Sequence, residues 1–166
     1  MSLQRFAATL TAVWAGIMIG VGYVFAPVLF KMMTTEKQFA GEIAGEAFTA
    51  IAYISLVFGV ILMAIIRREN TRAALTTPSA ALHLILIAVS LAIINHFIIT
   101  PELVLAKTGV NTQLSFAALH AMSNIVYAAQ IIVLLVLNWF LNKPLGKASQ
   151  TTQLESESKK QQEQDS

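Results

Sequence analysis

The sequence predicts an all-α fold: a polytopic membrane protein whose four transmembrane helices form an up-down bundle, with both termini in the cytoplasm. Composition is the first reason, because 56% of the 166 residues are apolar and only 12% are charged, against roughly a quarter charged in soluble proteins. The apolar residues also gather in four long stretches. The distribution of lysine and arginine then predicts the orientation.

Each of the four stretches is long enough to cross a bilayer, which takes about 20 helical residues. Formal charge is absent from all of them except the second, which holds Glu46 near its start. We interpret the first stretch as a retained helix, because its apolar run is about twice that of a signal peptide. The polar faces that a soluble bundle needs are missing. The predicted helices cover residues 6–30, 43–66, 79–100 and 114–141.

The positive charges indicate which side of the membrane each loop occupies. With four crossings, the two ends and the middle loop share one side, and that side is richer in lysine and arginine. The positive-inside rule places it in the cytoplasm, and a bacterial inner membrane is the membrane we expect. The residues counted on that side are Arg5, Arg67, Arg68, Arg72, Lys143 and Lys147, against Lys31, Lys37 and Lys107 on the other.

The chain divides into a transmembrane domain, residues 1–142, and a polar tail, residues 143–166. The tail is rich in Gln, Ser, Glu and Lys and cannot bury enough apolar surface to fold, so we expect it to be disordered. The absence of cysteine excludes disulfides and thiolate metal sites. No basic stripe with interleaved aromatics is present, so we expect no nucleic-acid partner. The lipid bilayer is the expected partner, with a second copy or another membrane protein left open.

Small residues mark the faces on which helices are expected to touch. Gly16 and Gly20 form a G-x-x-x-G spacing in the first helix, and Gly41 and Gly45 repeat it at the start of the second. In lipid, such grooves let two helix backbones approach closely. We therefore predict helix packing at these glycines.

A cluster of polar side chains is predicted near the outer leaflet. If the third helix ends near Pro101, His96 lies about 6 Å inside its outer end, and His120 lies about 9 Å inside the outer end of the fourth. Asn124 follows His120 on the same face. Ionisable groups within a membrane are costly and indicate a functional site by default. The candidate ligand-binding residues are His96, His120, Glu46, Glu42, Tyr23 and Asn124.

Several chemistries would use this cluster, and the residues leave them open. Two imidazoles at matched depth suit a transition metal or haem iron, and nearby methionines suit copper. A Glu-His pair suits a proton relay. Interhelical hydrogen bonding that only fixes the packing is the structural alternative. Because no tight H-x-x-x-H spacing exists, the metal signal is weak.

Several short motifs resemble those of a bacterial four-helix membrane family of unknown function, which is similar to a eukaryotic transmembrane protein associated with cisplatin resistance. These are P-V-L-F at residues 27–30, A-G-E-I-A-G-E-A-F at 40–48, H-F-I-I-T-P-E-L at 96–103 and F-A-A-L-H-A-M-S-N at 116–124. The resemblance spans residues 6–141 and implies no catalytic role for any residue. It marks Pro27, Phe30, Gly41, Gly45, Phe48, Pro101, Phe116, His120 and Ser123.

The layout is more distantly similar to the copper-resistance D proteins and to the haem-binding protoporphyrinogen oxidases of bacteria. Both place histidines in short helical bundles. The first helix here lacks the histidine that the oxidase family carries near its start, which argues against an oxidase.

The leading hypothesis is therefore a small membrane protein that binds or handles a metal ion or small ligand at the outer-leaflet cluster, without catalysis. One alternative is a haem-dependent membrane redox enzyme. Another is a structural or accessory subunit, in which the polar groups only hold helices together.

Overall fold

The computed structural model describes residues 3–72, 79–109 and 112–142, and it is all-helical over these ranges. Four of its helical rods are long and apolar enough to cross a membrane. The predicted all-α class with four membrane-spanning helices is confirmed, and the chain is a multi-pass membrane protein by the length and composition of its helices. The cytoplasmic placement of both termini stays a prediction. The predicted disordered tail, residues 143–166, lies outside the described ranges.

Two of the four rods are interrupted by a π-helical segment. The first rod consists of α1, η1 and α2, the second is α3, the third consists of α4, η2 and α5, and the fourth is α6. Their bounds are α1 Leu3–Ile19, η1 Gly20–Phe25, α2 Ala26–Met32, α3 Lys37–Arg72, α4 Ala80–Ile93, η2 Ile94–Ile99, α5 Thr100–Lys107 and α6 Phe116–Asn142.

The helices are longer than predicted where polar residues or a proline suggested an end. The second rod begins at Lys37 rather than at residue 43, so Glu42 is helical. The third rod does not end near Pro101 but continues to Lys107. Proline ends a helix because its ring clashes with the carbonyl four residues earlier, and here the wider π-helical turn precedes it. Sequence reasoning treated Pro101 as a stop and missed this accommodation.

Both π-helical segments lie directly before a proline. Pro27 is the second residue of α2 and Pro101 is the second residue of α5. At the end of each segment, a backbone N–H donates to the carbonyl five residues earlier, Ala26 to Val21 and Thr100 to Asn95. The Thr100 hydroxyl donates to that same Asn95 carbonyl at 2.9 Å. Such π-helical turns are rare and are frequent at functional sites.

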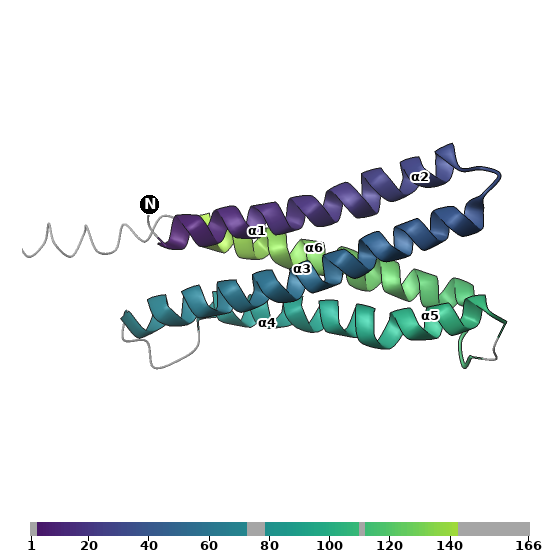
Figure 1. Cartoon of the computed structure of the whole chain (residues 1–166). Helices are drawn as coiled ribbons and strands as arrows, with labels where there is room; N and C mark the ends of the chain where they lie inside the picture. Colours follow the sequence, from purple (N-terminus) through teal and green to yellow (C-terminus); the bar gives the residue numbers. More distant parts are fainter. Residues whose placement is uncertain (1–2, 73–78, 110–111, 143–166) are drawn as a thin grey trace, which may run out of the picture.

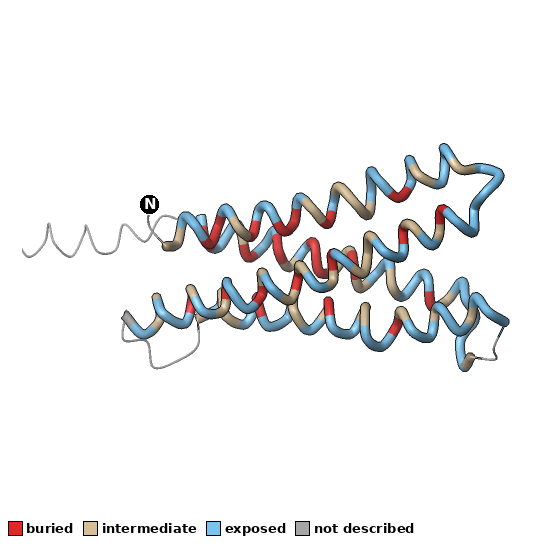
Figure 2. The backbone as a smooth tube through the Cα atoms, viewed as in Figure 1, coloured by how far each residue is buried: buried red, intermediate tan, exposed pale blue. Residues whose placement is uncertain are grey.

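The four rods form a ring in which α1 contacts α3 and α6, and α4 contacts the same two helices. We call the half of the bundle that holds Leu3 and Asn142 the terminal half, and the half that holds residues 33–36 the distal half (Figure 1). Buried residues are concentrated in the terminal half (Figure 2). The apolar core is therefore displaced toward one side of the membrane.

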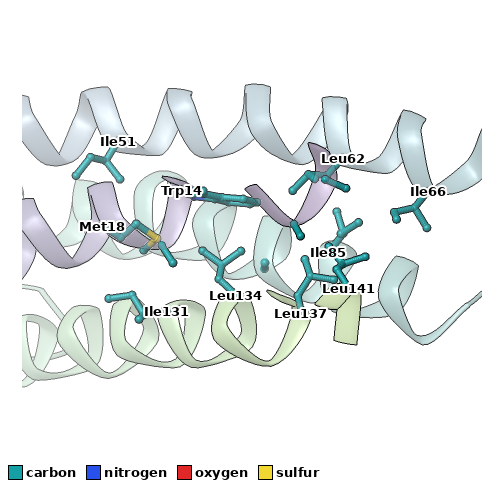
Figure 3. Packing of buried hydrophobic residues seen from close by; sticks show 14 of the residues in the cluster. Trp14, Met18, Ile51, Leu62, Ile66, Ile85, Ile131, Leu134, Leu137 and Leu141 are labelled. Carbon is teal, nitrogen blue, oxygen red and sulfur yellow. The ribbon is translucent and has the colours of Figure 1, made fainter. Parts of the chain in front are cut away.

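The core of the terminal half is made by large side chains from every rod (Figure 3). Trp14 and Met18 of α1 are fully buried, as are Leu62, Ile85 and Leu134 of the other three rods. The indole Nε1 of Trp14 donates to the Ser55 hydroxyl at 2.8 Å, which joins α1 to α3. Because burial in lipid drives association only weakly, tight packing and such bonds hold the rods together.

The distal half is organised as two separate helical hairpins. We call the first and second rods the first hairpin, and the third and fourth rods the second hairpin. In the distal half α2 packs on α3, and α5 packs on α6, and the two pairs diverge from each other (Figure 1). The buried apolar residues here are mostly small, with Ala26, Ala40 and Ala44 in the first hairpin. A wide core shared by all four rods is therefore confined to the terminal half.

Candidate functional site

His96 is held at the boundary between the two hairpins by an aromatic ring. It lies in η2 and is partly buried. The ring of Tyr53 on α3 meets it edge-on, with centroids 5.5 Å apart, and Phe97 flanks it at 4.8 Å. The residue before it, Asn95, accepts a 2.8 Å hydrogen bond from the Ser123 hydroxyl of α6. His96 therefore belongs to an interhelical contact rather than to the lipid-facing surface alone.

His120 lies near the start of α6, stacked on Phe116 with ring centroids 5.9 Å apart. It precedes Tyr127 by seven residues, so both side chains lie on the same face of α6. Tyr127 faces the bundle interior, where its hydroxyl donates to the Met18 carbonyl at 2.7 Å. His120 is nevertheless exposed, and so is Asn124. The face of α6 that is buried at Tyr127 is therefore exposed to the surroundings two turns closer to the start of the helix.

The two imidazoles are close in depth but have different aromatic neighbours. The Asn95–Ser123 hydrogen bond fixes the local register between η2 and α6. His96 is then about two residues, or roughly 3 Å, deeper than His120. The structure keeps the predicted similarity in depth, although the distances to the helix ends differ because the third rod is longer than expected.

Glu42 and Glu46 follow one stripe of α3 in the distal half. Both are exposed, and neither makes a side-chain hydrogen bond or ion pair with the described residues. Glu46 precedes Tyr53 by seven residues and shares its face. The carboxylate therefore lies about 10 Å closer to the distal end than the Tyr53–His96 pair. We call the stripe of Glu42, Glu46 and Tyr53, together with His96, the seam.

Tyr127 lies at the boundary between the distal half and the apolar core of the terminal half. Its ring meets Phe48 of α3 edge-on, with centroids 5.4 Å apart, and is tilted against Tyr23 at 6.5 Å. Tyr127 is 8% exposed, whereas Tyr23 is 57% exposed. Below this level the apolar core begins. Tyr23 therefore contacts Tyr127, and no ring contact joins it to His96 among the described residues.

A metal centre made by this chain alone is not supported by the donor set. Among the described residues, no group of three or more His, Asp or Glu side chains is close enough to hold a metal ion. Metal ions require several converging ligand atoms. An open pocket of about 290 Å³ lies at the distal end of the second hairpin, lined by Glu102, Gln113, Leu114 and Leu119. None of the predicted ligand-binding residues lines it.

The residues marked by the family resemblance lie mainly at contacts of the distal half. Phe48 packs on Tyr127, Phe116 on His120, and Ser123 bonds to Asn95. A side-chain carbon on Gly41 would lie 3.2 Å from the Lys107 amine and 3.9 Å from the Phe30 ring. Pro27 and Pro101 follow the π-helical segments, as described above. Most of these positions therefore take part in contacts or helix irregularities of the distal half.

The glycines predicted to pack helices behave differently from one another. A carbon added at Gly16, Gly20 or Gly45 would meet nothing within 4 Å. These three glycines do not mark contacts between helices of the described chain. At Gly22, in contrast, an added carbon would lie 2.6 Å from Cε1 of Tyr127. Gly22 is a close-approach position that the G-x-x-x-G rule did not single out.

Sequence reasoning also missed four side chains of the structure. Tyr53 holds His96, and its spacing of seven from Glu46 was a signal available in the sequence. The Trp14–Ser55 bond joins residues 41 positions apart and had no local signal. Gln130 is 2% exposed, and its Nε2 lacks a partner among the described residues.

Comparison with known proteins adds a family but no activity. Residues 9–112 match the family described as a domain of unknown function, DUF4149. The chain belongs to this family. No curated protein and no solved structure matches the chain. The matched DUF4149 segment covers most of the first three rods and ends before α6, so Phe116, His120 and Ser123 lie outside it.

Proposed function

We propose that this DUF4149 protein is a binding protein for a small organic cation, which enters from the outer leaflet and is held at the seam. The observation that carries the proposal is the exposure of Glu42 and Glu46 on the distal half of a membrane-spanning helix, without a side-chain partner among the described residues. An isolated carboxylate in that position is costly and indicates a compensating charge.

The chemistry of the seam favours an organic cation over a metal ion. Tyr53 is 53% exposed, and aromatic faces attract ammonium groups. A carboxylate beyond the ring supplies the opposite charge. Metal ions instead need three or more converging donors, which the described residues do not bring together. The haem-dependent enzyme has no separate observation in its favour.

We propose further that the distal end faces outward from a bacterial inner membrane. The support is the excess of lysine and arginine in the terminal segments and the middle loop. A membrane-dissolved cation would then reach the seam from the outer leaflet.

Binding of tetraphenylphosphonium to the purified full-length protein in lipid nanodiscs tests the function. We expect Glu46→Gln to weaken binding about tenfold, or about 1.4 kcal/mol, because the variant removes the negative charge that attracts the cation. Glu36→Gln removes the same charge from the exposed segment between α2 and α3, outside the seam, and should leave binding unchanged.

Three results would contradict the proposal. The first is equal loss of binding in both glutamate variants, which would indicate general surface charge. The second is the absence of tetraphenylphosphonium binding together with stoichiometric Zn²⁺ or copper that is lost in His120→Ala, which would indicate a metal site. The third is a Soret band in protein from haem-replete cells, which would indicate the redox alternative.

A further inference from the structure

The two hairpins are related by a constant shift along the sequence. Gly20 and Ile94, which begin the two π-helical segments, are 74 positions apart, and both segments are six residues long. Pro27 and Pro101 show the same separation. So do Tyr53 and Tyr127 on the inward-running rods, with no insertion or deletion between them. One shift therefore aligns both rods of one hairpin with both rods of the other.

Equivalent residues also make equivalent contacts. The ring of Tyr127 lies over Gly22, and the ring of Tyr53 lies against His96. Gly22 and His96 are again 74 positions apart. A half-turn about the bundle axis exchanges α1 with α4 and α3 with α6, which preserves the observed ring of contacts. The bundle is thus built from two copies of one helical hairpin around an approximate twofold axis.

The π-helical segments lie where the shared core gives way to the separate hairpins. Below them, the four rods share one apolar core. Above them, α2 packs on α3 and α5 packs on α6. Proline removes a backbone hydrogen bond, and helices kink mainly at prolines and π-helical bulges, so bending is expected there. Both outward-running rods carry this joint at the same position.

A contact between the hairpins at the distal end is made by Lys107 of the second hairpin. Its amine lies 3.2 Å from the position of a Cβ on Gly41 of the first hairpin, beside the Phe30 ring. The absence of a side chain at Gly41 gives the amine room. A lysine side chain extends its flexible stem over apolar surface and keeps its charged amine at the polar surface, so it reaches α3 without a fixed interface.

From these observations we propose that the two distal hairpins open and close as rigid bodies about the paired π-helical joints, with the Lys107–Gly41 contact marking the closed state. The terminal half acts as the fixed base. This opening motion goes beyond the proposed cation binding, because it depends on the π-helical joints and the Lys107–Gly41 contact and needs no ligand.

Double electron–electron resonance on the full-length protein in nanodiscs tests the opening motion. The sequence contains no cysteine, so introduced cysteines can be labelled without background. One pair is Thr34→Cys with Thr108→Cys, which are equivalent exposed positions at the two distal tips. The matched control pair is Ala12→Cys with Leu86→Cys, exposed equivalents in the terminal half.

We expect the distal pair to give a broad or two-component distance distribution and the control pair a single narrow one. From Gly20 to Met32 a helical arm is about 18 Å long, so a rotation of about 20° moves its tip by roughly 6 Å. Lys107→Met should shift the distal distribution toward the longer distance by about that amount. The control pair should not change.

A distal distribution as narrow as the control, unchanged by Lys107→Met, would overturn the proposal. A shift of both pairs together would also overturn it, since that result means global loosening of the bundle. The measurement is made without ligand, so failure of tetraphenylphosphonium binding does not affect it. Conversely, a single narrow distal distribution in a protein that still binds tetraphenylphosphonium would contradict the opening motion but not the proposed function.

Discussion

Tyr127 joins three rods through a single side chain. Its hydroxyl donates to the Met18 carbonyl of α1, its ring meets Phe48 of α3, and its own backbone belongs to α6. A buried phenol in lipid needs a hydrogen-bond acceptor, and a backbone carbonyl supplies one. Gly22 leaves the space that the ring fills. The packing between the distal half and the apolar core therefore depends on the Tyr127 ring filling the space that Gly22 leaves.

Gly22→Ala should destabilise the protein at this point. The added carbon would lie 2.6 Å from Cε1 of Tyr127, and overpacking of this kind costs about 1–3 kcal/mol. Thermal unfolding in detergent would show a lowered midpoint. Gly20→Ala is the matched control, because nothing lies within 4 Å of its added carbon. Equal midpoints for the two variants would contradict this account of the Tyr127 contact.

At the scale of the element, the first and third rods are continuous helices, and each contains one π-helical segment. Pro27 and Pro101 each lack the N–H that would donate to the carbonyl of Tyr23 or Phe97 in an α-helix. The preceding π-helical turns remove the clash and let each rod continue to the distal end. Without these turns each proline ring would clash with the carbonyl four residues earlier and would kink or end its rod at this level.

The double variant Pro27→Ala and Pro101→Ala should convert both joints toward α-helix. The new N–H groups can donate to the carbonyls of Tyr23 and Phe97, so local opening becomes more costly. Hydrogen exchange followed by mass spectrometry should show amides of α2 and α5 exchanging about tenfold more slowly, as one restored bond of roughly 1.4 kcal/mol implies. Amides of α6 serve as the internal reference. Unchanged exchange in α2 and α5 would show that the prolines do not cause the π-helical turns.

For the molecule as a whole, an asymmetric distribution of packing matches an asymmetric distribution of charge. The terminal half holds the large apolar core and carries the loop and ends rich in arginine and lysine. The distal half carries the exposed carboxylates, His120 and the diverging hairpins. One end of the bundle thus holds the shared apolar core, and the other end holds the two diverging hairpins.

The proposed sidedness predicts which introduced cysteines are reachable from outside intact cells. Thr108→Cys at the distal end should react with a membrane-impermeant maleimide. Thr71→Cys, at the terminal end of α3, should react only after the cells are permeabilised, because the positive-inside rule keeps Arg67 and Arg68 in the cytoplasm. Labelling of Thr71→Cys alone in intact cells would reverse the assigned orientation.

The sequence alone determined the number and type of the elements. Long uncharged runs such as residues 6–30 have too little polar surface for water, and only helices satisfy their backbone groups in lipid. It also placed polar groups such as Glu46 and His120 toward one end, since helical rise fixes depth along a rod. These are local properties, and they follow from composition and spacing.

Only the tertiary structure decided which groups meet. It paired His96 with Tyr53 and His120 with Phe116. It placed no atom within 4 Å of a Cβ on Gly16 or Gly20, and it used Gly22 for the close approach instead. It also carried the third rod past Pro101. The physical reason is that a contact depends on the rotation and tilt of two helices at once, whereas a hydrophobic run specifies the length of one helix and nothing about its neighbour.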